Sequence, residues 1–464
     1  MGHPTAFLST PRHEAGYRPV QSRTNDFAEV EQTLGNEERR QQASRCMNCG
    51  VPFCNWACPL GNLMPDWQDS LYLGNWKEAY HLLTETNPFP EFTGRICPAL
   101  CEQSCVLNLE HKPVTVRENE RAIIEYAFQE GWVKPQLPKK RTGKRIAVIG
   151  SGPAGLAAAH QLNRRGHFVT VFEKAPAIGG LLRYGIPNFK LDKSVLDRRI
   201  KLMNSEGVLF ISSLEIGQQL AIDVIINGFD AICLAVGSEE PRDLNIKGRS
   251  AKGIHFAMEL LAGERHKSTF PRLDDATVLV VGGGDTGSDC AGTAIRKGAK
   301  KVAQIEIMPK PPEAENSVTP WPYYPNILRT SSSHKEGVTR RWSLATKQFV
   351  TKGEQVAGVE VVEVEWTQNG KERPTMRETK NTEVIAADYV FLALGFVHPI
   401  HEGLLNQMGV TYDTGGNIQH DRFHTNIDRV YACGDCANGQ SLVVRAIESG
   451  MKAAEIIHEE FNAN

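Results

Sequence analysis

The sequence predicts an α/β protein in which two parallel-sheet units, one inserted into the other, follow an all-helical segment rich in cysteine. Three observations predict this fold class. Seven of the eleven cysteines fall in the first quarter of the chain. After them, an apolar strand, a glycine-rich turn, an alanine-rich helix and a second strand occur twice. A shorter strand–turn–helix pattern then returns near the carboxyl end.

Composition limits the class of protein and its partners. The 464 residues suffice for two to four domains, and 41% hydrophobic with 23% charged residues is ordinary for a soluble protein. A net charge of −2 gives no electrostatic reason to expect nucleic acid or an anionic membrane as a partner. The sequence shows neither a signal-peptide pattern nor an apolar run of membrane-spanning length. We therefore expect a cytoplasmic chain, in which disulfide bonds are rare.

The region 1–140 is expected to form a helical domain. Apolar residues recur at three- and four-residue spacing over 25–46 and over 75–85, which predicts amphipathic helices. The stretch 131–144 then brings two prolines, several basic residues and a glycine, which is typical of a linker.

The first glycine-rich turn follows the apolar strand 145–149 directly. Gly150 permits a tight turn, Gly152 lets backbone N–H groups approach a pyrophosphate at the helix N-terminus, and Gly155 lets helix and strand pack closely. Glu173 ends the second strand, where a carboxylate accepts hydrogen bonds from the ribose hydroxyls of an adenosine. The complete pattern predicts a Rossmann-like dinucleotide-binding fold.

The second unit repeats this pattern with Gly282, Gly284 and Gly287 after strand 277–281, and its second strand ends in Glu306. Two complete folds predict two dinucleotides, or one dinucleotide and a fold that has lost its ligand. FAD in one and a nicotinamide nucleotide in the other would let hydride pass between them.

A C-terminal pattern assigns FAD to the first fold. Gly434 and Asp435 follow a short apolar strand and precede a helix, and this resembles the second flavin fingerprint of flavoproteins with two dinucleotide domains. The resemblance implies a discontinuous FAD domain, 141–270 plus 395–464, with an NAD(P)H domain, 271–394, inserted into it. The expected cofactor-binding residues are Gly150, Gly152, Pro153, Ala154, Gly155, Glu173, Lys174, Gly180, Leu181, Gly237, Gly282, Gly284, Asp285, Thr286, Gly287, Glu306, Gly434 and Asp435.

The clustered cysteines have a spacing that favours iron–sulfur ligation. Thiolates suit either iron–sulfur clusters or zinc, but zinc sites usually pair cysteines at short internal spacing. Here the runs are Cys46, Cys49, Cys54 and Cys58, then Cys97, Cys101 and Cys105. Both Cys58 and Cys97 precede proline, as does the last cysteine of bacterial ferredoxin runs. Zinc ligation and unligated thiols are the alternatives.

Several segments together resemble one family over essentially the whole chain. They are "RCMNCGVPFCNWACPLGN", "NPFPEFTGRICPALCEQSC", "IGSGPAGLAAA", "GGLLRYGIPNFKL" and "ACGDCANGQSLVVRAI". They resemble the small (β) subunit of NAD(P)H-dependent glutamate synthase, and the N-terminal zone is also similar to dihydropyrimidine dehydrogenase. The resemblance implies two [4Fe–4S] clusters, one held by Cys46, Cys49, Cys54 and Cys105 and the other by Cys58, Cys97, Cys101 and Glu120. The pyrimidine enzyme has glutamine where this chain has Glu120, and a solvated acid on a helix is the alternative for that residue.

The resemblance also implies the reaction. Such a subunit oxidises NAD(P)H and passes electrons through FAD and its clusters to a large (α) subunit, which makes glutamate from glutamine and 2-oxoglutarate. No catalytic side chain is expected, because the cofactors perform the chemistry. Two alternatives stay open: the NADPH-side subunit of a ferredoxin:NADP transhydrogenase or sulfide dehydrogenase, and a subunit whose nucleotide sites serve structure or sensing.

The choice between NADH and NADPH depends on a few charges. Glu306 favours NADH, because a carboxylate there takes a ribose diol and repels a 2′-phosphate. Lys310, Arg340 and Arg341 could instead hold that phosphate, and ordinary surface charges are the alternative for these three residues.

Four further cysteines lie outside the two runs. Cys233 and Cys290 are expected to be buried packing residues. Cys433 and Cys436 form a C-x-x-C pattern, but they flank the flavin fingerprint, which disfavours a redox disulfide.

Overall fold

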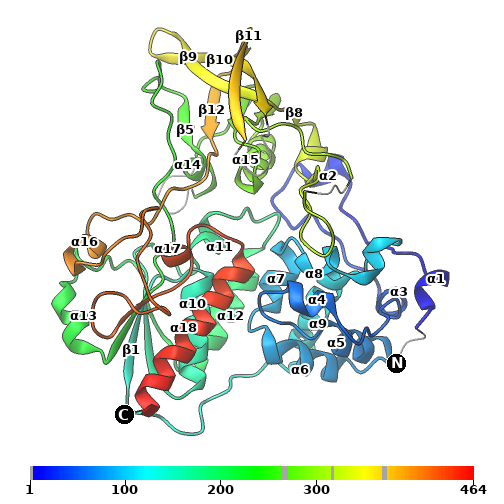
Figure 1. Ribbon diagram of the computed structural model, residues 1–464, viewed down its shortest axis with the longest axis vertical. Coiled ribbons are helices and arrows are strands. Elements are labelled where there is room, and N and C mark those ends of the chain that lie inside the picture. The colour runs from blue at the N-terminus through cyan, green and yellow to red at the C-terminus, as the bar shows by residue number, and fades with distance from the viewer. Residues whose placement is uncertain (1–3, 263–269, 315–317, 368–373, 464) are drawn as a thin grey trace.

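The computed structural model describes residues 4–262, 270–314, 318–367 and 374–463. Figure 1 shows a helical N-terminal region at the lower right, an α/β unit at the lower left and a second unit above both. The predicted fold class is confirmed, since the two units hold parallel five-stranded sheets and the N-terminal region is helical.

The N-terminal region packs its helices around a core of fully buried Trp67, Leu71, Leu83, Ile123 and Ile124. These residues form the apolar stripes of the helices Met64–Tyr72, Trp76–Thr86 and Val116–Gln129. The elements are α1 (Ala6–Ser9), α2 (Val20–Arg23), α3 (Asn36–Ala43), α4 (Phe53–Ala57), α5 (Met64–Tyr72), α6 (Trp76–Thr86), α7 (Pro90–Ile96), α8 (Leu100–Gln103), η1 (Val106–Leu109) and α9 (Val116–Gln129).

The helix expected over 25–46 forms only over α3, so that prediction is wrong for residues 25–35. The reason is a tertiary contact that outweighs local periodicity. The Val30 N–H donates to the Phe189 carbonyl oxygen at 3.0 Å, and the Arg18 N–H donates to the Val30 carbonyl oxygen at 2.9 Å. The expected helix over 75–85 is confirmed as α6.

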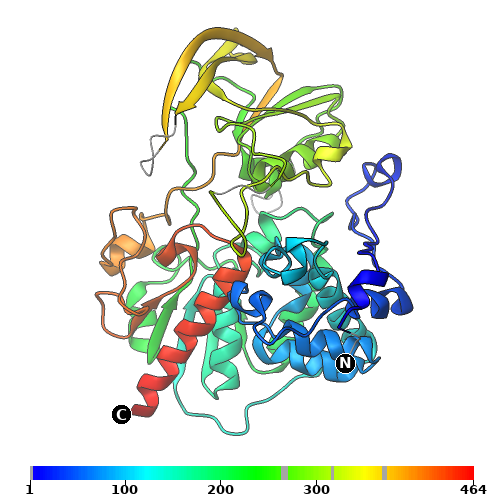
Figure 2. The ribbon, with the colours of Figure 1, turned by 45° about the vertical axis from the view of Figure 1, so that its right-hand side comes forward.

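The first α/β unit has a parallel sheet in the order β13-β4-β1-β2-β3. Its strands are β1 (Arg145–Ile149), β2 (Phe168–Phe172), β3 (Leu209–Ile211), β4 (Ala231–Leu234) and β13 (Val430–Ala432). Its helices are α10 (Pro153–Arg164), α11 (Leu181–Tyr184), α12 (Lys193–Ser205), α13 (Ile222–Gly228), α16 (Leu404–Met408), α17 (Asp435–Asn438) and α18 (Val443–Ala463). The strand β13 and the helix α18 come from the end of the chain. The first unit is therefore discontinuous, and the second unit is inserted into it in the sequence (Figures 1 and 2).

The second unit has a parallel sheet in the order β5-β12-β6-β7-β8 and a separate antiparallel sheet of β11-β10-β9. Its elements are β5 (Ile254–Phe256), α14 (Ala257–Leu261), β6 (Thr277–Val281), α15 (Asp285–Arg296), β7 (Lys301–Ile305), η3 (His334–Glu336), β8 (Thr339–Arg341), β9 (Leu344–Lys352), β10 (Gln355–Thr367), β11 (Thr375–Ala386) and β12 (Tyr389–Leu392). β5 lies inside the range 141–270 expected for the first fold, yet it pairs with β12.

Buried ion pairs tie the N-terminal segment and the first unit to the second unit. Arg23 and Arg296 both donate to the Glu336 carboxylate, at 2.7 Å and 2.6 Å, and all three side chains are almost fully buried. Lys190 of the first unit pairs with Asp289 of α15. In Figure 2 the dark-blue N-terminal segment accordingly rises toward the second unit.

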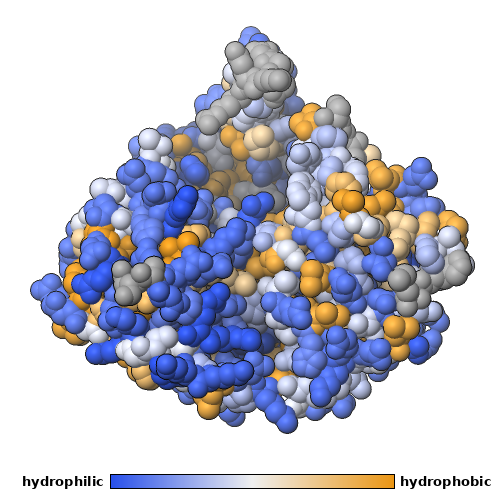
Figure 3. All heavy atoms as spheres, turned by 60° about the horizontal axis from the view of Figure 1, so that its bottom comes forward, coloured by the Kyte–Doolittle hydropathy of each residue, from blue (hydrophilic) through white to orange (hydrophobic). Residues whose placement is uncertain are grey.

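No helix in the described parts of the chain is long and apolar enough to cross a membrane. The face in Figure 3 is mostly hydrophilic, with hydrophobic residues scattered singly or in small groups, as is normal for protein surfaces.

The buried His160 of α10 gives a testable dependence of stability on pH. Burial, reinforced by Arg199, Arg164 and Arg165, lowers the pKa of His160 to about 3. In the unfolded chain the imidazole has a pKa of about 6.5. Below that pH the unfolded state therefore binds a proton that the folded state does not bind. This contribution to the free energy of unfolding should therefore fall by about 2 kcal/mol from pH 7.5 to pH 5.

Urea unfolding of the wild type and of His160→Gln at both pH values checks this prediction. The variant should lose less stability than the wild type on acidification, by about those 2 kcal/mol. Equal losses in the two proteins would contradict it. The other histidines with lowered pKa values, His167, His334 and His458, are present in both proteins, so their contributions cancel in the comparison.

Candidate functional site

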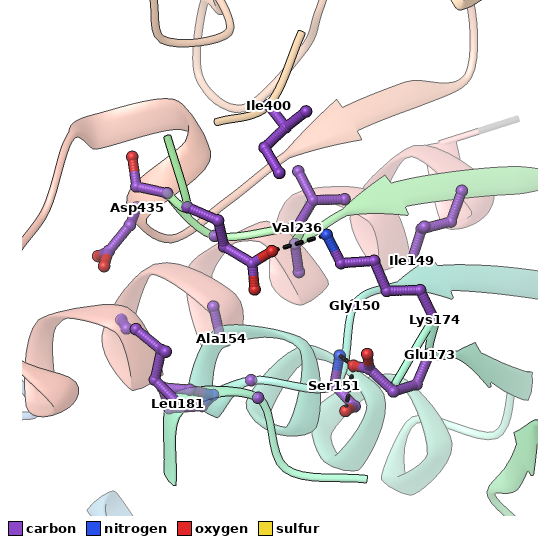
Figure 4. Close-up of a pocket in the computed structure, with 18 of the residues that line it drawn as sticks. Ile149, Gly150, Ser151, Ala154, Glu173, Lys174, Leu181, Val236, Ile400 and Asp435 are labelled. Atoms are coloured by element: carbon purple, nitrogen blue, oxygen red, sulfur yellow. Dashed lines mark hydrogen bonds and ion pairs between the residues drawn. The ribbon is translucent and has the colours of Figure 1, made fainter. Parts of the chain in front are cut away.

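A cavity of about 220 Å³ opens at the carboxyl end of the first sheet, where ligands bind in open α/β sheets. Figure 4 shows side chains from the turn after β1, from the end of β2 and from the C-terminal segment converging on it. The expected cofactor-binding residues that line this cavity are Gly150, Gly152, Pro153, Ala154, Glu173, Lys174, Gly180, Leu181, Gly237 and Asp435.

The first glycine-rich turn has the geometry that the spacing predicts. Gly150 adopts φ +103°, a conformation that other residues rarely take. A Cβ on Gly155 would clash with the Gly150 carbonyl oxygen, so this glycine allows α10 to lie against β1. A Cβ on Gly152 would meet no atom within 4 Å. The turn thus leaves open space at the N-terminus of α10, where a pyrophosphate fits.

Glu173 is held in place at the end of β2. Its Oε2 accepts hydrogen bonds from the Ser151 N–H at 3.1 Å and from the Ser151 hydroxyl at 2.6 Å (Figure 4). Its Oε1 accepts the Ala175 N–H at 2.7 Å. This buried carboxylate lines the cavity at the position where the ribose of a dinucleotide is bound in such folds.

The C-terminal segment closes the cavity from the other side. Gly434 has φ +73°, and a Cβ there would come 2.6 Å from the Ala154 Cβ, so it permits close approach of the two segments. Burial raises the pKa of Asp435 to about 6, while the Ser441 hydroxyl donates to its Oδ1 at 3.2 Å. The first glycine-rich turn and the C-terminal segment, which the flavin resemblance assigned to one domain, therefore lie together in space.

Other lining residues were not found from the sequence. Ser151 orients Glu173, and Glu239 accepts a hydrogen bond from Lys174 at 2.6 Å. Ile400 and Glu402 reach the cavity from the segment after β12. The positions of Glu239, Ile400 and Glu402 at the cavity depend on tertiary folding, so no local pattern indicates them. Ser151 lies inside the glycine-rich turn itself and could have been inferred from the motif.

The second glycine-rich turn repeats the backbone geometry of the first. Gly282 has φ +126°, and a Cβ on Gly287 would clash with the Gly282 carbonyl oxygen. Gly284 again faces open space, and it precedes Asp285 and Thr286 in the first turn of α15. The Glu306 carboxylate lies against Gly283 and accepts the Met308 N–H at 3.1 Å. All six expected residues are thus gathered at the carboxyl end of the second sheet.

The three basic residues near Glu306 have partners of their own. Arg341 pairs with Glu383, and Lys310 pairs with Glu313 at 3.1 Å. Arg340 donates to the Arg329 carbonyl oxygen and lies over the Trp342 ring.

The first cysteine grouping surrounds a small cavity of about 30 Å³. Cys46, Cys49, Cys54 and Cys105 all line it, and the other lining side chains are apolar except for a glutamine. Burial, with a smaller contribution from Cys105, raises the pKa of Cys46 to about 12. Such thiols stay protonated unless a metal binds them. Four sulfurs around an apolar cavity fit an iron–sulfur cluster.

The second grouping brings together Cys58, Cys97, Cys101 and Glu120. Burial raises the pKa of Cys97 to about 12, and Glu120 and Cys58 are near enough to raise it further. Burial also raises the pKa of Glu120 to about 7. The glutamate is only 6% exposed, so the alternative of a solvated acid is wrong.

Glu120 has one carboxylate oxygen committed to hydrogen bonds. Its Oε1 accepts from the Asn87 amide at 3.2 Å and from the Thr93 hydroxyl. Neither bond uses Oε2, which suits that oxygen to act as the fourth ligand of a cluster. Within the described residues, no three His, Cys, Asp or Glu side chains converge on a point as ligands of one metal ion do.

The four remaining cysteines are fully buried, so the expectation of packing roles for Cys233 and Cys290 is confirmed. The Cys433 sulfur lies 3.6 Å from that of Cys233, while the Cys436 thiol donates to the Cys433 carbonyl oxygen at 3.2 Å.

Comparisons with known proteins agree with this geometry. The family model for pyridine nucleotide-disulphide oxidoreductases matches residues 144–450, and that for dihydropyrimidine dehydrogenase domain II, 4Fe-4S cluster, matches residues 23–132. FprA from Mycobacterium tuberculosis in complex with NADPH superposes with a TM-score of 0.57 at 17% identity, covering 69% of this chain and 85% of that chain. That likeness concerns the fold.

Two curated relatives are similar over nearly all of this chain. The glutamate synthase [NADPH] small chain of Mycobacterium tuberculosis is 45% identical over 98% of this chain and 96% of its own length. The glutamate synthase [NADH] of Schizosaccharomyces pombe is 44% identical over 98% of this chain, which spans 22% of that longer protein. The chain therefore belongs to the glutamate synthase small-chain family.

Proposed function

We propose that this chain is the NAD(P)H-oxidising, electron-transferring subunit of a cytoplasmic glutamate synthase. Its partner would be a large subunit that makes glutamate from glutamine and 2-oxoglutarate. The observation that carries the proposal is the presence, in one chain, of a cavity at the first glycine-rich turn and of two groupings of half-buried and buried cysteines. Leu60 and Ile96, close in sequence to Cys58 and Cys97, pack against the core of the first unit, so these parts are contiguous.

The first fold and the C-terminal segment would hold FAD, and the second fold would hold NAD(P)H. When bound, FAD supplies the hydride acceptor and the clusters supply one-electron carriers. Gly152 leaves room for the pyrophosphate, Glu173 presents a carboxylate to the ribose, and Asp435 faces the remainder of the cavity. The proposed domains are 1–140, 141–270 plus 395–464, and 271–394. The strand β5 is an exception to these bounds: it lies within 141–270 but belongs to the third domain, because it pairs with β12.

Two [4Fe–4S] clusters would fill the cysteine groupings. The ligands would be Cys46, Cys49, Cys54 and Cys105 for one, and Cys58, Cys97, Cys101 and Glu120 for the other. Support comes from the shared cavity of the first four and from the raised pKa values of Cys58, Cys97 and Cys101, each of which has Glu120 among its causes after burial.

We propose NADH as the preferred donor, because the fixed Glu306 carboxylate would take a ribose diol and repel a 2′-phosphate. The name of the Mycobacterium tuberculosis relative points instead to NADPH, and that of the Schizosaccharomyces pombe relative to NADH. Replacing Glu306 with alanine is expected to raise kcat/KM for NADPH relative to NADH by about tenfold. Ferricyanide as electron acceptor lets both nucleotides be assayed on the same protein.

Glu354→Ala serves as the control, since Glu354 is an exposed carboxylate of the same unit that pairs with Lys252 on the surface. It should leave the ratio unchanged. A strong NADPH preference of the unmutated protein would show that Glu306 does not select the nucleotide.

The subunit role is tested by mixing the purified chain with the large chain of a glutamate synthase. We expect a stable complex and glutamine- and 2-oxoglutarate-dependent oxidation of NAD(P)H. Ferredoxin-dependent turnover without such a complex would instead favour the transhydrogenase alternative.

A further inference from the structure

Gln68 is the polar side chain among the residues that line the cavity of Cys46, Cys49, Cys54 and Cys105. It lies on α5 one turn after Met64, which also lines the cavity, so both project from the same face of the helix. Gln68 is fully buried.

A relay of hydrogen bonds orients the Gln68 amide. Arg39, which can only donate, gives a hydrogen bond from Nη1 to the Asn119 Oδ1 at 3.5 Å. This leaves the Asn119 Nδ2 to donate to the Gln68 Oε1 at 2.9 Å. The other end of the Gln68 amide is therefore the nitrogen, Nε2, which is buried without a hydrogen-bond partner.

An unpartnered buried donor costs about 1–3 kcal/mol, so its presence calls for an acceptor. The cavity offers the cysteine sulfurs and apolar side chains. We propose that Gln68 tunes the cluster held by these four cysteines: its Nε2 donates a hydrogen bond to a cluster sulfur and raises the reduction potential. This inference rests on the proposed function, since it requires a cluster at this place.

The direction of the effect follows from charge. Reduction adds one negative charge to the cluster, and an N–H donor stabilises the more negative form. Removing one such hydrogen bond should shift the reduction equilibrium about tenfold toward the oxidised form. For a one-electron couple that is about 59 mV downward.

The test is a redox titration of the full chain, prepared anaerobically and followed by electron paramagnetic resonance. Gln68→Leu removes the donor at similar volume. Gln68→Glu removes it but keeps an acceptor for the Asn119 amide, which protects the fold. Gln42→Leu is the matched control, because Gln42 is a buried glutamine of the same region whose amide is paired at both ends, with the Pro11 carbonyl oxygen and the His13 N–H.

Both Gln68 variants should lower the potential of one cluster, Gln68→Leu by the stated shift and Gln68→Glu by at least as much because its carboxylate adds negative charge. The other cluster should be unchanged, and Gln42→Leu should change neither. Equal shifts in both clusters, or no shift beyond the control, would overturn the proposal. Loss of iron from both Gln68 variants with retention in the control would also overturn it, because Gln68 would then be structural. Absence of iron from the unmutated chain would be a failure of the proposed function instead.

Discussion

Serine in place of Cys54 is expected to lower the iron content of the purified chain from about eight to about four atoms. Cys54 lines the first cavity, and burial together with Cys105 and Cys46 raises its pKa far above the ordinary value. A buried serine hydroxyl is a harder and weaker ligand for iron than a thiolate. Cys101→Ser should remove the other cluster in the same way.

The two variants should keep their flavin and their NAD(P)H:ferricyanide activity, because the dinucleotide cavity lies in the first unit. Glutamate formation with the large subunit should be lost. Cys290→Ser is the control, since Cys290 is fully buried in the core of the second unit. Assays of iron and acid-labile sulfide compare these three variants with the unmutated chain. Retention of all the iron in Cys54→Ser and Cys101→Ser would contradict the ligand assignment.

Alanine in place of Gly155 should lower both stability and flavin affinity, whereas alanine in place of Gly152 should lower flavin affinity alone. At Gly155 the added Cβ meets the Gly150 carbonyl oxygen and comes within 3.3 Å of the Ala235 Cβ. The helix α10 must then move away from β1, which should lower the free energy of unfolding by about 1–3 kcal/mol and weaken flavin binding as well. At Gly152 the Cβ enters the open space of the cavity and displaces only ligand.

Gly152→Ala should therefore keep the thermal midpoint of the flavin-free protein and still raise the Kd for FAD by about tenfold or more. Thermal unfolding after flavin removal, together with titration of FAD into the same samples, separates the two effects. Normal FAD affinity in Gly152→Ala would show that the pyrophosphate does not approach this turn.

Local spacing explains which parts of the site the sequence could predict. The residues of both glycine-rich turns and their terminal acids Glu173 and Glu306 lie within one continuous strand–turn–helix–strand unit each, so a linear pattern reveals them. The pairing of Cys105 with the first cysteine run needed the family resemblance, because no spacing rule joins segments that far apart.

Tertiary contacts explain what the sequence could not predict. Phe27, Val30 and Leu34 have helical spacing, but residues 25–35 are not helical because Val30 bonds to the backbone at Phe189. The burial of Glu120 depends on α7, which supplies Thr93. The ion pair of Arg23 with Glu336 joins residues 313 positions apart, and no local pattern indicates it.

The central claim is that reducing equivalents from a pyridine nucleotide reach iron–sulfur clusters within this one chain. Anaerobic addition of NADH or NADPH to the purified chain, followed by visible and electron paramagnetic resonance spectra, tests it most directly. We expect about eight iron and eight acid-labile sulfide per chain, one FAD, and bleaching of the flavin on addition of nucleotide. A chain that contains flavin but neither iron nor sulfide would contradict the account.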